Sequence, residues 1–424
     1  MAGAMNPAIH FASYAKKRTN HRVTGLLLAG LLLLVLLLPA CGGMDRNKLS
    51  AMDTEELKAY VVPENKQASA IYAARLFEEN RGDYDLPLKI AEPLAEEGNS
   101  DALYAMAMSY LKGHGKPKSC LNALEFLNRS AESGNQLALY ELGKRYDIGD
   151  CMEKDIILAV NYYRQAAQKG LAVAQYNLAV AYSQGEGVEQ NDTEAVYWYK
   201  KAAAQGNTHA MYNLAARYAT GRGVPKDPKQ AYKYYLAAGE GNLPQAQFTL
   251  GVIYLTDSTF VMAGQDYQIA FSWFMKAANQ GLSRAQYHIS LLYRSGIGVP
   301  KNMDEAAIWA EKAANSGDSD AQFTIGVAYD RGQGKPKDAR QAAYWYKKAA
   351  ENGNAKAMYN LALNYVHGEG VKPDYKEAYF WANAAQKFGI EQARTIVDAV
   401  AKILPPDQAE DLRSKAYAWQ PNGL

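Results

Sequence analysis

AMYNLA, the sequence of residues 210–215, occurs again at residues 357–362. Six identical residues rarely recur by chance in a chain of 424. The two copies lie 147 residues apart, so any repeated unit must fit that distance. A regular internal repeat indicates an array of similar structural units, and the repeat length identifies the kind of unit.

A row of alanines gives the repeat length. Starting from Ala210, an alanine recurs every 36 residues in both directions, except that one spacing is 39. The interval of 147 residues is therefore four repeats of 36 plus three extra residues. A period of this size predicts units that bury their apolar faces against one another. The alanines, which we call position 0 of each repeat, are Ala102, Ala138, Ala174, Ala210, Ala246, Ala285, Ala321, Ala357 and Ala393.

The first part of each repeat predicts a helix, which we call helix A. Small or apolar residues occupy positions 0, 4 and 5, and tyrosine occupies position 8 in each of the first eight repeats. Residues at this spacing lie on one face of an α-helix. The tyrosines are Tyr110, Tyr146, Tyr182, Tyr218, Tyr254, Tyr293, Tyr329 and Tyr365.

A glycine-containing loop separates helix A from a second predicted helix, helix B. Residues 185–188 read GEGV, and two glycines this close interrupt a helix and allow positive φ. Position 17 carries Ser, Asp or Asn, which cap helix N-termini. In five repeats Glu or Gln follows three residues later, which predicts a capping box. The predicted caps are Ser119, Asp155, Asn191, Asp227, Asn302, Asp338 and Asp374.

Helix B also shows a helical apolar stripe. In the third repeat the residues at i, i+3, i+4 and i+7 are Ala195, Trp198, Tyr199 and Ala202. The helix is expected to end near Gly206, because glycine is the usual residue just after a helix C-terminus. Small residues in both helices predict close approach, and the aromatic residues predict a filled space between repeats.

The combined pattern AxYNLAxxYxxGxGVxxDxxxAxxWYxKAAxxGN resembles the Sel-one-like repeat, a branch of the tetratricopeptide-like superfamily. Eight in-phase copies between residues 101 and 389 carry the resemblance. It implies an all-α fold, a right-handed α-solenoid of stacked antiparallel helix pairs. It also implies that the chain serves mainly in protein–protein contact and has no catalytic residue.

The segments outside the eight repeats complete the predicted domain organisation. Residues 1–40 are predicted to be a signal peptide, residues 41–66 a polar tether, and residues 67–100 a degenerate N-terminal capping repeat. Residues 390–424 are predicted to form C-terminal capping helices that cover the last apolar face. The fifth repeat carries an insertion near residues 256–269.

The N-terminal leader predicts export. Basic residues between Lys16 and Arg22 precede an apolar run of 16 residues at 23–38. A membrane-spanning helix needs about 20 residues, whereas a basic segment followed by a short apolar run is typical of a secretory signal. An uncleaved anchor remains the alternative.

Residues 38–41 read LPAC and resemble the bacterial lipobox, the signal for lipidation and cleavage before a cysteine. The resemblance implies that Cys41 becomes the lipid-modified N-terminus. Because Gly42 and not aspartate follows, it also implies a periplasm-facing lipoprotein of the bacterial outer membrane, with surface exposure left open. An ordinary secretory signal followed by an incidental cysteine is the alternative.

The two remaining cysteines predict a disulfide, because an exported protein meets an oxidising compartment. Cys120 begins helix B of the first repeat, and Cys151 replaces the second loop glycine of the next repeat. Stacked repeats place such loops side by side, within reach of the Cα separation that a disulfide needs. Two free thiols are the alternative.

No catalytic or metal-binding pattern is present in the sequence. The six histidines show no metal-ligand spacing, the only S-x-x-K begins at Ser13 in the leader, and K-T-G is absent. The net charge is +2, and the leader holds four basic residues and no acid, so the remaining chain carries −2 and offers no electrostatic footprint for nucleic acid. We expect no enzyme activity, no cofactor and no metal.

Helix A carries the predicted partner-binding residues. In tetratricopeptide-like arrays position 2 faces the concave groove, and here position 2 is aromatic in all eight repeats. Groove exposure and packing between repeats both stay open, because aromatic side chains serve either purpose. Phe260 in the insertion likewise either contacts a partner or folds onto a neighbouring loop. The predicted partner-binding residues are Tyr176, Tyr212, Phe248, Tyr287, Phe323, Tyr359 and Phe260.

These features together predict a lipid-anchored scaffold or adaptor for other proteins of the bacterial envelope, or for peptide segments of them. One alternative is a cell-wall-associated enzyme that binds or hydrolyses β-lactams. A second alternative is a surface-exposed factor that binds a host protein.

Overall fold

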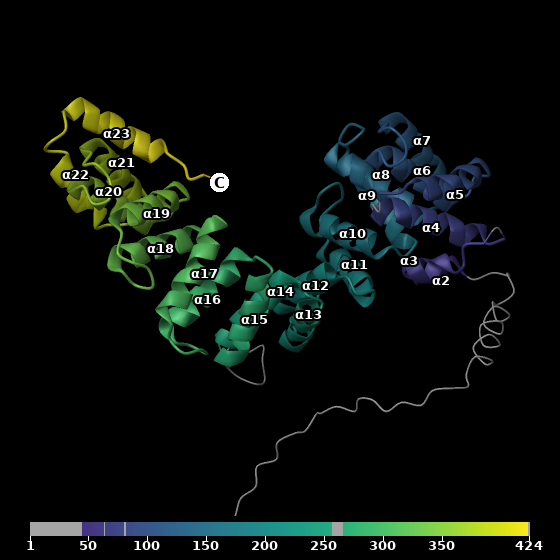
Figure 1. Cartoon of the computed structure of the whole chain (residues 1–424), viewed down its shortest axis with the longest axis horizontal. Coiled ribbons are helices and arrows are strands. Elements are labelled where there is room, and N and C mark those ends of the chain that lie inside the picture. The colour runs from purple at the N-terminus through teal and green to yellow at the C-terminus, as the bar shows by residue number, and fades with distance from the viewer. Residues whose placement is uncertain (1–44, 63, 80–81, 257–265, 423–424) are drawn as a thin grey trace, which may run out of the picture. The chain divides into compact units, whose positions relative to one another are not determined.

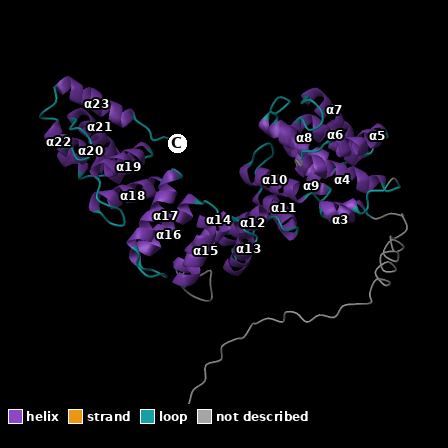
Figure 2. Ribbon diagram, viewed as in Figure 1, coloured by secondary structure: helices purple, strands orange, loops and turns teal. Residues whose placement is uncertain are grey.

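The computed structural model describes residues 45–62, 64–79, 82–256 and 266–422. Within these ranges the chain forms helices and connecting loops and contains no strand (Figure 2). The chain divides into two compact units, residues 1–135 and residues 136–424. We describe each unit by itself. The predicted all-α solenoid of stacked antiparallel helix pairs is confirmed.

The described part of the first unit begins with two short helices and continues with two helix pairs. The second pair is the first complete repeat. The helices are α2 (Arg46–Ala51), α3 (Thr54–Lys58), α4 (Lys66–Glu79), α5 (Asp85–Glu96), α6 (Ser100–Lys112) and α7 (Cys120–Glu132).

The segment expected to be a polar tether is folded from Arg46 onward. Leu49 and Leu57 are 1% and 0% exposed and belong to an apolar cluster with α4. The Arg46 guanidinium donates two hydrogen bonds to the Asp101 carboxylate, at 3.0 and 2.6 Å. The sequence predicted a tether because few apolar residues of this segment share a face. Leu49 and Leu57 nevertheless pack the segment against α4.

The second unit consists, in its described residues, of seven helix pairs followed by two further helices (Figure 1). Helix A and helix B of each pair pack against each other, and helix B packs against helix A of the next pair. The helix A elements are α8 (Gln136–Ile148), α10 (Ala172–Gln184), α12 (Thr208–Thr220), α14 (Pro244–Leu255), α16 (Ser283–Ser295), α18 (Ser319–Arg331) and α20 (Ala355–His367). The helix B elements are α9 (Ile156–Gln168), α11 (Asp192–Ala204), α13 (Pro228–Glu240), α15 (Tyr267–Asn279), α17 (Met303–Asn315), α19 (Ala339–Glu351) and α21 (Tyr375–Lys387).

All seven predicted N-caps of helix B accept hydrogen bonds from backbone amides of the first turn. The reciprocal half of the predicted capping boxes is not formed in these helices. In α21, for example, the Glu377 carboxylate accepts from the Trp381 indole N–H at 3.0 Å. Among the described helices only α3 has a complete capping box, between Asp53 and Glu56.

The core of each repeat lies between helix A and helix B. Leu214 at position 4 is 0% exposed, and Tyr199 of α11 is 2% exposed. Close packing also explains the small residues at position 5. A Cβ atom on Gly326 would lie 2.7 Å from the ring of Tyr346, so a side chain at this position would have to displace that ring.

The loop glycines join successive repeats. Gly187 has φ +68, and a Cβ on it would lie 2.5 Å from the carbonyl oxygen of Ile156, the first residue of the preceding helix B. Cys151 occupies the position equivalent to Gly187 and also has a positive φ, of 67°. Cys120 occupies the position equivalent to Ile156. Both cysteines are disulfide-bonded, so the predicted disulfide is present.

The C-terminal segment covers the last repeat. Helices α22 (Ala393–Val400) and α23 (Pro406–Ala418) both pack against α21. Beyond α23, the ring of Trp419 lies 5.5 Å from that of Trp381. The backbone N–H of Asn422 donates to the carbonyl of Glu351 at 2.9 Å, which fixes the end of the chain to α19.

Three features expected from the sequence lie outside the described residues: the leader, Cys41, and Phe260 of the insertion. In the part of the chain that is described, no helix has the length and apolar character that crossing a membrane requires.

Candidate functional site

The aromatic residues at position 2 of helix A form a half-buried ladder in the second unit. Most of these rings face the residue at position 25 of the same repeat, on helix B, counted without the three extra residues of the fifth repeat. The ring centroids of Tyr212 and Tyr235 are 5.5 Å apart, and those of Phe323 and Tyr346 are 5.8 Å apart. The ladder therefore contributes to packing within the repeat and also keeps an exposed edge.

Position 25 belongs to a recurring cluster of three side chains. In the second repeat the Tyr163 hydroxyl donates to the Asp147 carboxylate at 3.0 Å, and Asn177 of the next helix A also hydrogen-bonds Tyr163. Burial, followed by the negative charge of Asp147, raises the pKa of Tyr163 well above its usual range. The phenol stays protonated and serves to join two repeats.

The same cluster recurs in the third and seventh repeats, with position 9 of helix A and position 3 of the next helix A as the partners of the tyrosine. The members are Tyr199 with Ser183 and Asn213, and Tyr346 with Asp330 and Asn360. The asparagines that follow the ladder residues in the sequence thus hold neighbouring tyrosines.

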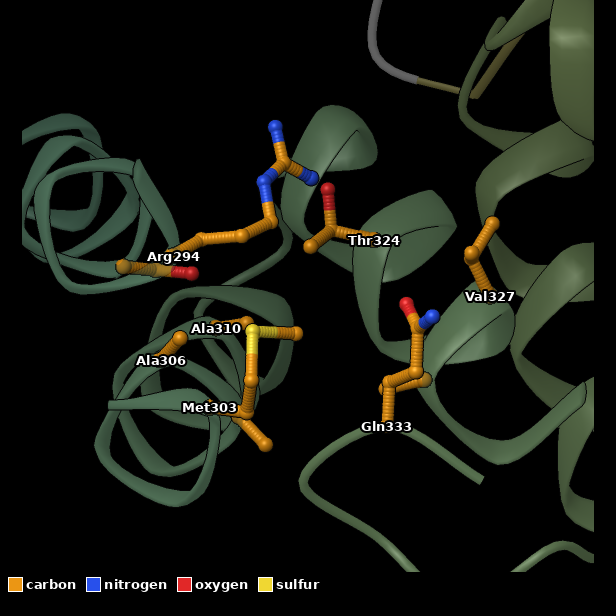
Figure 3. Close-up of a pocket in the computed structure, with 10 residues that line it drawn as sticks. Arg294, Met303, Ala306, Ala310, Thr324, Val327 and Gln333 are labelled. Carbon is orange, nitrogen blue, oxygen red and sulfur yellow. The ribbon is translucent and has the colours of Figure 1, made fainter. Parts of the chain in front are cut away.

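The sixth repeat departs from this cluster at all three positions. Ala310 stands where the tyrosine would be, Arg294 where the acid would be, and Thr324 where the asparagine would be. A hollow of about 30 Å³ lies there, lined by residues of α16, α17 and α18. Figure 3 shows the Arg294 and Thr324 side chains directed toward each other above Ala310 and Met303.

A wider hollow of about 380 Å³ shares Arg294 and Thr324 with the first. Two residues of the aromatic ladder, Tyr287 and Phe323, line it. Burial raises the pKa of Tyr287, while a hydrogen bond with Thr324 acts in the opposite direction. Since Ala310 supplies no ring at position 25, Tyr287 lacks the cross-helix ring contact that Phe323 makes with Tyr346.

The charges around these hollows leave Arg294 uncompensated. Arg294 is exposed, and it takes part in none of the ion pairs between described residues. Asp320 and Asp318, the acids whose charges act on Tyr287, accept hydrogen bonds from neutral amides and form no ion pair with Arg294. Asp320 accepts from the Asn354 amide at 2.8 Å, and Asp318 accepts from the backbone N–H of Ala321 at 2.9 Å.

A buried hydroxyl also faces the smaller hollow. Ser290 is 0% exposed, lines this hollow, and its Oγ has no hydrogen-bond partner among the described residues. A buried polar group without a partner costs roughly 1–3 kcal/mol. The sixth repeat therefore combines a missing ring, a free cation and an unsatisfied hydroxyl in one place.

A third hollow of about 430 Å³ is lined by Tyr176, Arg217 and Arg222 among others. Both arginines are held by one carboxylate, because Asp192 pairs with Arg217 at 2.5 Å and with Arg222 at 3.1 Å. Burial alone would raise the pKa of Asp192, but hydrogen bonds and charge from the two arginines lower it. In this hollow, unlike the hollow at Arg294, each arginine has an ion-pair partner.

The structure thus brings together two of the predicted partner-binding residues, Tyr287 and Phe323, and places Tyr176 at a separate hollow. Phe248 is enclosed by Phe274 and His288, with ring centroids 5.4 and 5.0 Å away. Tyr359, like Tyr212, is half-buried on helix A.

Sequence reasoning missed the residues that make the hollow of the sixth repeat, namely Ser290, Arg294, Ala310 and Thr324. The signal that could have found them is the departure from the pattern at positions 9 and 25. Within the described residues, no cluster of three or more His, Cys, Asp or Glu side chains could hold a metal ion.

Among solved structures, the chain resembles a Sel1 repeat protein from Oxalobacter formigenes, with 27% identity and a TM-score of 0.58 over 84% of this chain and 100% of the other. It also resembles c5321, a protective antigen of uropathogenic Escherichia coli, with 27% identity and a TM-score of 0.38 over 87% of this chain and 96% of the other.

Similarity to a curated protein is local. A segment of 43 residues is 44% identical to DAP3-binding cell death enhancer 1 of Rattus norvegicus, which is 10% of this chain. The match spans 8% of the length of that relative.

The Sel1 repeat family model matches eight consecutive segments: residues 100–135, 136–171, 172–207, 208–243, 244–282, 283–318, 319–354 and 355–385. These segments begin at helix A and extend into or through helix B of each pair. Sel1 repeat proteins serve as scaffolds for protein interactions and are generally non-catalytic. The chain belongs to the Sel1 repeat family.

Proposed function

We propose that this chain is a lipid-anchored scaffold of the bacterial envelope that binds partner proteins along the helix A face of its second unit. The observation that carries the binding surface is the hollow beside α16 and α18, where Tyr287 and Phe323 lie next to an uncompensated arginine. Interface energy usually concentrates in a few aromatic and arginine side chains of this kind.

The partly exposed ladder supports an extended binding surface. Most ladder rings pack against a ring of their own repeat, as in the pair of Tyr212 and Tyr235, so their orientation is fixed before a partner arrives. A surface whose side chains are already ordered loses little conformational entropy on binding. Successive repeats offer such a ring at regular intervals, which suits an extended segment of a partner protein.

The proposed envelope location rests on the leader sequence and on the disulfide. The basic leader, the apolar run at 23–38 and the sequence LPAC support export and lipidation at Cys41, with the folded repeats facing the periplasm. The disulfide supports an oxidising compartment. In the described residues no observation favours the two alternatives, a β-lactam-directed enzyme or a host-binding surface factor.

Affinity capture from solubilised membranes tests the binding surface. We compare the native full chain with the variants Tyr287→Ala and Phe323→Ala. Tyr344→Ala is the matched control, because Tyr344 is 52% exposed on helix B. We expect the two helix A variants to lose a partner that the native chain and the control retain, while their circular dichroism is unchanged. Equal capture by all four proteins would contradict the proposal.

A further inference from the structure

The sixth repeat changes the hydrogen-bonding character of the recurring cluster. In the second repeat, an acceptor at position 9, Asp147, holds the hydroxyl of Tyr163. In the sixth repeat the donor Arg294 takes the place of the acid, and Ala310 removes the phenol that the acid would hold. In the sixth repeat no tyrosine hydroxyl therefore occupies this space, and the Arg294 side chain that lines it is a hydrogen-bond donor.

The space is suited to a small acceptor group. The inner hollow of about 30 Å³ opens beside the wider hollow of about 380 Å³, and Arg294 and Thr324 line both. The unpaired Ser290 hydroxyl lines the inner hollow. A hydrogen-bond acceptor that reaches this point satisfies Ser290 and meets the guanidinium of Arg294.

Charge selects a carboxylate as that acceptor. Arg294 has no ion-pair partner among the described residues, and Asp320 and Asp318 are held by Asn354 and by a backbone amide. A guanidinium presents parallel N–H donors that match the two oxygens of a carboxylate. Lys356 also lines the wider hollow and adds positive charge beside Asp320.

We propose that this hollow receives the carboxylate of an aspartate or glutamate side chain from an extended segment of a partner protein. The carboxylate pairs with Arg294 and accepts from Ser290, and the neighbouring residues of the segment lie against Tyr287 and Phe323. The inference rests on the proposed function of protein binding and adds the chemical class of the anchor.

The other repeats do not offer this combination. In the eighth repeat Ala382 also replaces the tyrosine, but the two partner positions carry Val366 and Ile396, which have no polar group. In the third repeat the ring of Tyr199 is present at position 25, and both arginines beside Tyr176 pair with Asp192. An acidic anchor therefore fixes the register of a partner segment at the sixth repeat.

Two peptides test the proposal by fluorescence anisotropy with the full chain. Both are fluorescein-labelled decapeptides with an amidated C-terminus, one with a central Leu-Glu-Leu and the other with Leu-Gln-Leu. We expect the Glu peptide to bind at least about tenfold more tightly, since a hydrogen bond to a charged group is stronger than one between neutral groups. The preference should shrink at high salt. Equal binding of the two peptides would overturn the proposal.

Three variants assign the preference to the hollow. Arg294→Gln removes the cation from an exposed position, and Ala310→Tyr restores the ring that Tyr163 and Tyr346 supply elsewhere. Both should abolish the preference for Glu, and the control Arg340→Gln, an exposed arginine of α19, should keep it. A preference that survives in Arg294→Gln would refute the assignment. If the ladder variants lose their partner while no Glu preference exists, the scaffold proposal stands and this inference fails.

Discussion

In several repeats, the size of the residue at position 5 of helix A is limited by the side chain that faces it from helix B. Position 5 of helix A is glycine in the second, fifth and seventh repeats, where an aromatic ring stands at position 25. A Cβ on Gly143, Gly251 or Gly326 would lie 2.7 or 2.8 Å from that ring. In the sixth repeat, where Ala310 replaces the ring, the same position accommodates Ser290. In these repeats a side chain at position 5 and a ring at position 25 therefore compete for the same space, whereas the third and fourth repeats combine alanine at position 5 with tyrosine at position 25.

Gly326→Val tests this shared volume. The added side chain would overlap the Tyr346 ring, and overpacking of a core costs about 1–3 kcal/mol. Tyr346→Ala alone should also destabilise, because it leaves a cavity. In the double variant the two changes compensate, so the loss in its free energy of unfolding should be smaller than the sum of the two separate losses. Strictly additive losses in denaturant titrations would show that the two residues do not share space.

Tyr235 should make stability depend on alkaline pH. Burial, followed by the proximity of Tyr212, raises the pKa of Tyr235 to about 12, above the value of about 10 for a tyrosine in an unfolded chain. The neutral phenol therefore stabilises the fold below about pH 10, and this contribution is lost as pH rises toward 12, by about 1.4 kcal/mol per pH unit. Tyr235→Phe keeps the ring and should lose less stability between pH 9 and 11. Parallel stability–pH curves for the two proteins would contradict this.

At the scale of the element, the sequence was most informative where a local rule determines the structure. The helix pairs, the seven N-caps and the helix-ending glycines follow from spacing and capping preferences within a few residues. The reciprocal bond of the capping box is absent at α21, where the Glu377 carboxylate accepts from the Trp381 indole instead. The docking of Arg46 onto Asp101 could not be foreseen, because it joins residues 55 apart in the sequence.

The disulfide belongs to the same scale, because it occupies a loop contact that glycine makes elsewhere. Cys151 stands at the position of Gly187, whose loop lies against the first residue of the preceding helix B. Closing a loop of about 31 residues contributes about 3–4 kcal/mol in the chain-entropy model. We expect reduction to lower the unfolding midpoint of the native protein to that of the variant Cys120→Ser/Cys151→Ser. Two alkylatable thiols at Cys120 and Cys151 in the native, non-reduced protein would contradict the bond.

At the scale of the whole molecule, the repeats share one architecture, and the sixth repeat differs from the others in the side chains that line its hollow. The sequence predicted the frame and the aromatic ladder because both are periodic. It did not predict the hollow at Arg294, because that site arises from three residues on α16, α17 and α18 that differ from their counterparts together. Such a site can be predicted only when it is known which residues contact one another across the three helices.

The proposed envelope anchor also concerns the whole chain. Cys41→Ser should block lipidation, because a serine cannot form the thioether that the LPAC sequence directs. We expect the variant to leave the outer-membrane fraction after a salt wash, whereas Cys120→Ser/Cys151→Ser should stay in it. Unchanged fractionation of Cys41→Ser would show that the lipobox interpretation is wrong.

The central claim, that partners bind the helix A face, is tested most directly by site-specific photocrosslinking in cells. A benzophenone amino acid is placed at Phe323 on helix A or at Tyr344 on helix B of the same repeat. These positions belong to facing helices of one pair, and Tyr344 is the more exposed of the two. We predict that a defined protein adduct forms from position 323 and not from position 344. An adduct with the same protein from position 344 alone would contradict the account.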